Sequence, residues 1–480
     1  MSVAGWEPVI GLEVHCELRT ATKLFCGCRN AFGDEPNTNV CPVCLGLPGS
    51  LPVLNAQAVE LAMRIGVALH CEIRPSTFHR KNYFYPDMPK DYQISQYDEP
   101  INVEGNLELP DGSRVGIVRA HMEEDTGKTT HVGGGGRIHD AEYALVDYNR
   151  AGVPLVEIVS APDIRSSAQA RAYAAELRSI LVATEASDGR MEEGSMRVDA
   201  NVSVRPVGTS ELGTRCEIKN LNSLRSLGRA IEYEIERQVQ VLEAGDSVAQ
   251  QTRHWDEEAA RTVALRSKEE AFDYRYFPEP DLVPLAPDVA WQKDVAAALG
   301  PMPAERRDRL HSLARGDGAS VPDKLADQIA TVVELGLDHL VIAATDAGVS
   351  SGRAIARTAN EAASDPAAAR DVDPAAYCAL LRMEELGSLS ATQAKAVLVE
   401  LFAHGGDPAE IARRKGFERL GDDSLADVVS QVIEANRADW ERYLSGEDKV
   451  EQFFVGQVMK ATRGQADGKA VVAELQRRRS

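Results

Sequence analysis

The chain has 480 residues and a formal net charge of −21 at pH 7, and 44% of its residues are hydrophobic. This length and apolar content predict a globular protein of roughly two to four domains. No apolar run approaches the roughly 18 residues of a membrane span, and the N-terminus has no signal-peptide pattern, which together predict a cytoplasmic protein. The acidic charge argues against a protein that coats nucleic acid non-specifically, but it excludes no specific RNA partner.

The first predicted strand covers residues 9 to 18, where apolar and polar residues alternate. Side chains two positions apart lie on the same face of a strand, so Glu13, His15 and Glu17 share one face. Two carboxylates and an imidazole at this spacing suit a divalent cation. A charged sheet edge would produce the same pattern, and the two interpretations remain equal here.

Four of the eight cysteines cluster, as Cys26-x-Cys28 and Cys41-x-x-Cys44, in a stretch of loop composition. Two close thiolate pairs predict a structural zinc site, although Cys-x-Cys is less usual than Cys-x-x-Cys as the first pair. A site with four thiolates has no open coordination position, so we expect it to hold the loop 26–44 together and not to catalyse. Four unrelated thiols are the alternative.

A helix is predicted from residue 55 to about 69, and the run HRKNYFYPDMPKDYQISQ follows at residues 79–96. Its prolines exclude a long helix, and its aromatic rings accompany Arg80, Lys81 and Lys90. The run predicts an ordered loop with stacking faces and cations. An aromatic mini-core explains the same residues equally well.

The stretch RVGIVRAHMEEDTGK, residues 114–128, predicts a strand that ends in three consecutive carboxylates. Alternation puts Val118, Ala120 and Met122 on an apolar face and Arg119, His121 and Glu123 on a polar face. Such a concentration of negative charge favours a bound cation, and a solvated acidic turn is the alternative. Glu123 and Glu124 would face oppositely in a regular strand, so both reach one site only if the strand ends or bulges there.

Four further strands are predicted at residues 142–149, 153–160, 196–204 and 215–219. Two of them carry a carboxylate on the polar face of an alternation, and the strand 153–160 carries Glu157 inside an apolar run. Besides His15, the polar faces then hold five to seven carboxylates, drawn from Glu13, Glu123, Glu124, Glu157, Asp199, Glu217 and Glu17. We predict a mainly antiparallel sheet whose open face holds Mg²⁺ and a nucleotide. The Gly133–Gly136 run lacks phosphate-loop spacing and predicts a flexible hairpin loop.

Helices are predicted at residues 167–185 and 221–242, with a charged one from about Asp256. The proline-rich segment 274–288 marks a domain boundary, beyond which helical spacing replaces strand alternation, as at residues 325–333 and 425–433. A second boundary is predicted at residues 403–407. The last 24 residues carry six Lys or Arg against two acids, which predicts contact with RNA phosphates or, alternatively, a solvated helix.

These residues support an enzyme that uses Mg²⁺ and ATP, and six stretches closely resemble the B subunit of the tRNA-dependent amidotransferase. The stretches are GLEVH from Gly11, KNYFYPDMPK from Lys81, HMEEDTGK from His121, VDYNRAGVP from Val146, RVDANVS from Arg197 and VGQVMKATRG from Val455. The resemblance implies an α+β chain with a glutamine-synthetase-like cradle domain (1–290), a helical domain (291–404) and a small helical tail domain that meets tRNA (405–480).

The resemblance also implies the reaction. The family phosphorylates the side-chain carboxylate of mischarged Glu-tRNA(Gln) or Asp-tRNA(Asn) with Mg-ATP, and ammonia then displaces the phosphate. Its metal positions carry over onto Glu13, His15, Glu123, Glu124, Glu157, Asp199 and Glu217, and Lys81 falls where its ammonia passage reaches the site. We therefore expect Glu123, Glu124 and Lys81 to be catalytic, and an amidase-like A subunit and a small C subunit to complete a heterotrimer.

Two other functions explain fewer of these residues. A non-catalytic, zinc-stabilised RNA-binding scaffold would not need carboxylates in the middle of its strands. A ligase that amidates a small free acid would not need a basic tail. The chain has no Gly-Gly-Ser-Ser-Gly stretch of an amidase, so its ammonia must come from elsewhere.

Overall fold

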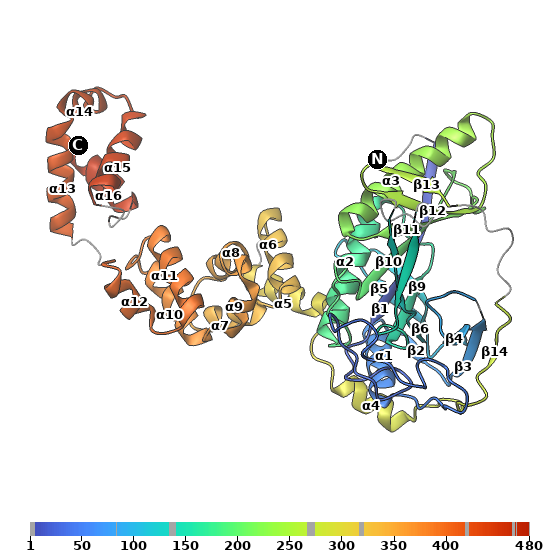
Figure 1. Ribbon diagram of the computed structural model, residues 1–480. Coiled ribbons are helices and arrows are strands. Elements are labelled where there is room, and N and C mark those ends of the chain that lie inside the picture. The colour runs from blue at the N-terminus through green and yellow to red at the C-terminus, as the bar shows by residue number, and fades with distance from the viewer. Residues whose placement is uncertain are drawn as a thin grey trace. The chain divides into compact units, whose positions relative to one another are not determined.

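The computed structural model describes residues 5–82, 84–133, 141–265, 274–315, 321–417, 422–462, 466 and 468–479 (Figure 1). The chain divides into two compact units, Met1–Pro303 and Ala304–Ser480. The first unit contains the β-sheet, and the second is helical.

Twelve strands of the first unit form one sheet in the order β13-β12-β11-β10-β1-β9-β6-β4-β3-β14, with β5 beside β6 and β2 beside β5. Their bounds are β1 Trp6–Glu17, β2 Glu72–Ile73, β3 Thr77–Asn82, β4 Tyr92–Glu99, β5 Asn102–Glu108, β6 Arg114–Glu124, β9 Pro154–Ser160, β10 Met196–Pro206, β11 Cys216–Leu221, β12 Gln251–Asp256, β13 Arg261–Ala264 and β14 Phe277–Pro278. Among these strands only β11 and β12 pair in parallel. The predicted α+β fold with a mainly antiparallel sheet is therefore confirmed.

A separate hairpin of β7 (Lys128–Val132) and β8 (Tyr143–Asp147) follows β6. Of the predicted glycine loop, Gly133 follows β7 directly, and Gly134–Gly136 fall outside the described residues.

Three helices cover the apolar face of the sheet: α1 (Ala56–Ala68), α2 (Ser167–Ala183) and α3 (Leu224–Glu243) (Figure 1). Each begins at a residue whose side-chain oxygen accepts from the first turn, namely Asn55, Ser166 and Ser223. Ile10, Leu12, Val14 and Cys16 of β1 are completely buried in the same core as Leu177 and Ile231. The other face of β1 is left for Glu13, His15 and Glu17.

The first unit extends beyond the predicted boundary at residue 290. Helix α4 (Val289–Ala297) packs beside α1 and buries Val295 in the core of the sheet unit. Proline-rich composition alone could not show this, because the contact is made by the residues that follow.

Two sequence-based expectations about this unit are wrong. Val118 is 48% exposed, whereas Ile117, Ala120 and Met122 are buried, because the pairing register with β9 shifts between Ile117 and Arg119. The predicted charged helix from Asp256 is, over the described residues, the end of β12 followed by β13. The β-branched Thr262 and Val263 pair with β12 there.

The second unit consists of α5 Pro303–Arg315, α6 Asp323–Glu334, α7 Asp338–Asp346, α8 Ser351–Asn360, η2 Ala362–Ser364, α9 Pro366–Asp371, α10 Pro374–Glu385, α11 Ala391–His404, α12 Pro408–Arg414, α13 Asp422–Ala435, α14 Arg437–Leu444, α15 Val450–Ala461 and α16 Gly468–Arg479. Its described residues form two apolar clusters, one from Leu310 to Ala412 and one from Leu425 to Leu475. Helix α12 buries Ile411 in the first cluster, so the change of core falls after residue 412 and not at the predicted 404.

No single helix in the described part of the chain is long and apolar enough to cross a membrane. Helices α6 and α7 are long and apolar enough only when taken together, and the angle between them is 114°. Their apolar residues, such as Ile329, Val332 and Leu340, are buried in the first helical cluster.

Candidate active site

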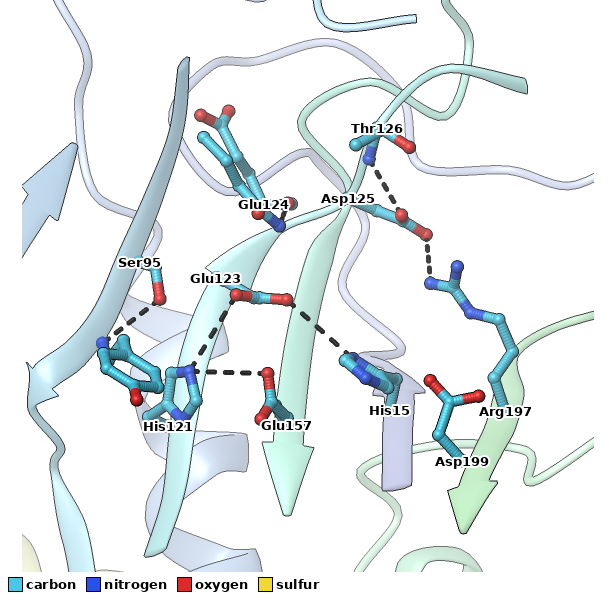
Figure 2. Close-up of polar contacts among 12 residues, drawn as sticks. His15, Ser95, His121, Glu123, Glu124, Asp125, Thr126, Glu157, Arg197 and Asp199 are labelled. Atoms are coloured by element: carbon cyan, nitrogen blue, oxygen red, sulfur yellow. Dashed lines mark hydrogen bonds and ion pairs between the residues drawn. The ribbon is translucent and has the colours of Figure 1, made fainter. Parts of the chain in front are cut away.

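Three neighbouring strands bring two imidazoles and two carboxylates to the polar face of the sheet (Figure 2). Glu157 on β9 lies opposite His15 of β1 on one side and opposite His121 of β6 on the other. Glu123, two residues after His121, projects to the same face. The pairing register therefore brings His15 to three residues that are more than 100 positions away from it in the sequence.

The group is compact and largely buried. His15 Nδ1 lies 3.8 Å from Glu123 Oε1, and ligand atoms of His15, Glu123 and Glu157 all fall within 4.8 Å of one another. His121 Nε2 lies 3.9 Å from Glu123 Oε2 and 3.8 Å from Glu157 Oε2. Glu123 and His121 are buried, and His15 is half-buried.

Burial dominates the electrostatics of the group. It raises the pKa of Glu157 to about 8, with help from the nearby Glu123, and it raises the pKa of Glu123. It lowers the pKa of His15 to about 3 and that of His121 well below its usual value. Neutral imidazoles beside carboxylates that resist ionisation fit a divalent cation, whose charge would let both carboxylates ionise.

A second set of predicted ligands lies on β1, β10 and β11. Glu13 is opposite Asp199 in the sheet. Lys219 Nζ lies 2.8 Å from Asp199 Oδ2 and 2.7 Å from Glu217 Oε1. Asn201 Nδ2 donates to Glu13 Oε1 at 2.9 Å. In this structure the Lys219 ammonium supplies positive charge to Asp199 and Glu217, and Glu13 is held by the Asn201 amide.

The structure separates Glu124 from Glu123. Both are in register with β9, opposite Pro154 and Leu155, so the strand does not bulge there and their side chains point to opposite sides. Glu124 Oε1 accepts from Lys90 Nζ and, at 2.9 Å, from the Ile94 backbone N–H. The expectation that both carboxylates reach one group therefore fails, and Glu124 lies instead beside the cysteine loop, in a cavity that Cys44 also lines.

Lys81 and the aromatic run frame the site. The run 79–96 forms the end of β3 and the start of β4. The predicted loop is therefore limited to the residues between these strands, of which Tyr83 lies outside the described residues. Lys81 Nζ lies 5.1 Å from the ring centroid of Tyr274, and the Arg80 guanidinium 4.3 Å from that of Tyr92. Both cations therefore lie over aromatic rings of the protein itself, a contact that either interpretation of the run allows.

The four clustered cysteines converge as predicted from their spacing. The sulfur atoms of Cys26, Cys28, Cys41 and Cys44 lie within 4.8 Å of one another. A tetrahedral zinc ion would hold four sulfurs about 3.8 Å apart, so the cluster fits that ion. The Cys26 thiol donates to Cys44 and lowers the pKa of Cys44, and the fully buried Lys23 lowers it further.

Sequence reasoning placed His121 on the polar face but did not include it among the ligands. It also missed Lys219 as an ion-pair partner and the pair Arg197–Asp125, whose atoms Nη2 and Oδ2 lie 2.7 Å apart (Figure 2). Glu17 lies beside Asp125, outside the compact group, and burial raises its pKa to about 8. The alternation of β6 placed His121 on the polar face, and that of β11 placed Lys219 beside Glu217, whereas the pairs of Lys219 with Asp199 and of Arg197 with Asp125 depend on how the strands are arranged.

The fold and this site define a class: a sheet-based catalytic domain with nitrogen and oxygen donors for a cation, joined to a helical unit. Residues 8–293 match the family model of the GatB/GatE catalytic domain, and residues 351–478 match that of the GatB domain. The chain belongs to this family.

Curated relatives match over nearly the whole chain. The chain is 49% identical to the B subunit of the aspartyl/glutamyl-tRNA(Asn/Gln) amidotransferase of a Mycobacterium species, over 98% of this chain and 96% of the relative. It is also 49% identical to the protein of the same name from Moorella thermoacetica, over 96% of this chain and 97% of the relative.

Proposed function

We propose that the chain is the B subunit of an amidotransferase that converts mischarged Glu-tRNA(Gln), Asp-tRNA(Asn) or both to the amidated forms. The carboxylate of the attached amino acid is phosphorylated by ATP, and ammonia then displaces the phosphate. The observation that carries this proposal is the compact group of His15, Glu123 and Glu157 on a sheet that matches the family's catalytic domain. A reaction on tRNA also implies a cytoplasmic protein.

His15, Glu123 and Glu157 would hold one Mg²⁺, and Glu13, Asp199 and Glu217 a second. Bound Mg²⁺ would neutralise charge on the transferred phosphoryl group. The chain's own part is to orient these donors from adjacent strands and to keep them out of bulk water. Lys219, which already spans Asp199 and Glu217, would be released toward a phosphate when a cation takes its place.

Lys81 keeps its expected place, where the family's ammonia passage reaches the site, whereas Glu124 lies outside the compact group and is not proposed as its ligand. Lys81 lies close enough to the group to influence His15, His121, Glu123 and Glu157 electrostatically. Glu124 is paired with Lys90 beside the cysteine loop. The four thiolates would hold a structural Zn²⁺ there and keep the loop against this pair.

The source of nitrogen and the contact with RNA would both lie outside the sheet unit of this chain. An amidase-like A subunit would supply ammonia and a small C subunit would brace the complex. The helical unit would contact the tRNA. The relatives are named as one subunit of their enzyme, which agrees with a multi-subunit assembly.

The test is amidation with purified subunits. Given mischarged tRNA, ATP, Mg²⁺ and an ammonium salt, the chain should form the amide without the amidase, with the small subunit added if folding needs it. With glutamine as the only donor, it should form none until the amidase joins. Glu123→Gln should lower amide formation at least roughly a hundredfold and leave tRNA affinity unchanged, because a lost ligand acts on the charged transition state. Glu211→Gln, at an exposed position, is the matched control.

Three results would contradict the proposal. Glutamine-driven amidation by the isolated chain would show that the nitrogen source was assigned wrongly. Failure with ammonium in the full complex would exclude the transamidase. Amidation of a free amino acid as fast as of the charged tRNA would favour the small-acid ligase.

A further inference from the structure

His121 is a buried imidazole that the proposed ligand set leaves without a role. Its side chain is completely buried, and neither ring nitrogen has a hydrogen-bond partner among the described residues. Buried polar atoms in folded proteins are nearly always paired, so two unpaired nitrogens on one ring require an explanation.

The distances around this ring suit ligands of one ion better than hydrogen bonds. Nε2 lies 3.9 Å from Glu123 Oε2 and 3.8 Å from Glu157 Oε2, beyond hydrogen-bond range (Figure 2). Two atoms that each bind one cation at about 2.1 Å are separated by roughly 3 to 4 Å. His15 Nδ1 stands at the same kind of distance, 3.8 Å, from the other oxygen of Glu123.

The ring is also held in place. Tyr97 packs edge-on against the imidazole, with centroids 6.0 Å apart, and its own ring carries the Arg119 guanidinium at 4.4 Å. The register of β6 with β9 sets His121 opposite Glu157. An imidazole fixed in this way presents Nε2 to the two carboxylates without having to rearrange.

We infer that His121 is a ligand of the active-site cation, through Nε2, together with Glu123 and Glu157. With His15, the site then holds two imidazole nitrogens. Mn²⁺ accepts the same carboxylate oxygens as Mg²⁺, and it is paramagnetic, so it can report how many imidazole nitrogens the centre binds. This inference rests on the proposed function in that it concerns the same site.

Pulsed electron paramagnetic resonance of the full chain loaded with Mn²⁺ alone tests it, because electron spin-echo modulation detects nitrogen bound to manganese. Wild-type protein should show two imidazole nitrogens, which become ¹⁵N signals after histidine labelling. His121→Gln and His15→Gln should each leave one, and His121→Gln should raise the Mn²⁺ Kd roughly tenfold or more. The control is His79→Gln, which replaces a buried histidine of β3 whose Nδ1 contacts the Thr77 carbonyl at 3.2 Å. This variant should change neither the number of bound imidazole nitrogens nor the Mn²⁺ Kd.

The wild-type spectrum keeps the test decisive even if a variant fails to fold. One imidazole or none at Mn²⁺ saturation would overturn the inference, as would an unchanged spectrum in folded His121→Gln. If the wild-type protein gives such a result but still amidates charged tRNA, His121 is not a ligand and the proposed function is unaffected. Two imidazoles in a complex that cannot amidate would instead leave this inference standing and remove the proposed function.

Discussion

Cys44 shows at the scale of one residue how the cysteine loop is tied to the sheet. Its sulfur accepts the Cys41 backbone N–H at 3.1 Å. The side chain of the buried Lys23 donates to the Tyr148 carbonyl at 3.2 Å and contributes positive charge near Cys44. A cluster of thiolates needs such a cation, because four sulfurs on one zinc ion leave a net negative charge in a partly buried place.

Purified protein should contain about one zinc ion per chain. Cys44→Ser should lose that ion and lower the free energy of unfolding by roughly 2 kcal/mol or more, because metal binding is coupled to the folding of the loop. Elemental analysis and thermal unfolding measure the two effects. The control is Cys71→Ser, outside the cluster, which should keep the zinc. If protein prepared without chelator contains no zinc, the prediction of a structural zinc site is wrong.

At the scale of elements, Glu234 fastens α3 to the far strands of the sheet. This completely buried carboxylate accepts from Arg237 and Gln238 of its own helix, at 2.6 and 2.9 Å, and from Thr262 of β13 at 2.9 Å. Burial alone would raise the pKa of Glu234, but hydrogen bonds from Arg237, Gln238 and Thr262, with the charge of Arg237, outweigh it and lower the pKa.

Glu234→Gln should therefore destabilise the first unit by about 3 kcal/mol at pH 7, since it leaves buried cations without their partner. A carboxyl group whose pKa is lower in the folded state stabilises above its unfolded pKa, and this contribution disappears as pH falls. The difference between wild type and variant should shrink between about pH 5 and pH 3. Urea unfolding across this range measures it, with Glu236→Gln on the exposed side of α3 as control. A difference that is independent of pH would contradict the account.

Elements with regular local patterns were predictable. Alternation identified β1, β6, β10 and β11, an apolar run identified β9, and the helix predicted from residue 55 corresponds to α1, because such patterns are local properties of the sequence. The exposure of Val118 depends on a register shift against β9, which no single strand reveals. The same limit applies to the site. The residue types on these strands predicted a bound cation. Only the pairing of the strands shows that Glu124 lies outside the compact group and that His121 lies beside Glu123 and Glu157.

At the scale of the whole molecule, the basic tail is less free than its composition suggests. Arg479 pairs with Asp448 at 2.7 Å, Arg477 with Glu474 at 2.8 Å, and Arg478 donates to Ser430 Oγ at 2.7 Å. These contacts stabilise the last helical cluster. RNA phosphates would have to compete for the same guanidinium groups.

Deleting residues 422–480 should weaken tRNA binding. It should also reduce the slope of log K against log salt concentration by about one unit for each RNA phosphate that the tail neutralises in the full chain. The cut falls after residue 412, so Ile411 and the first helical cluster stay intact. Affinity measured over a series of salt concentrations, with circular dichroism to check the remaining fold, tests this. Unchanged affinity and slope would show that the tail does not bind the RNA.

The central position of β1 has a consequence for how the protein is made. Among the described strands, β1 pairs only with β9 and β10, which begin at Pro154 and Met196. Ribosomes add about 5–20 residues per second, so β1 waits on the order of ten seconds for its first partner. During that time a strand with a fully apolar face has both edges open to wrong partners. Strand β1 is therefore a part of the nascent chain that a ribosome-bound chaperone has reason to shield, and His15 cannot meet Glu157 before β9 has been synthesised.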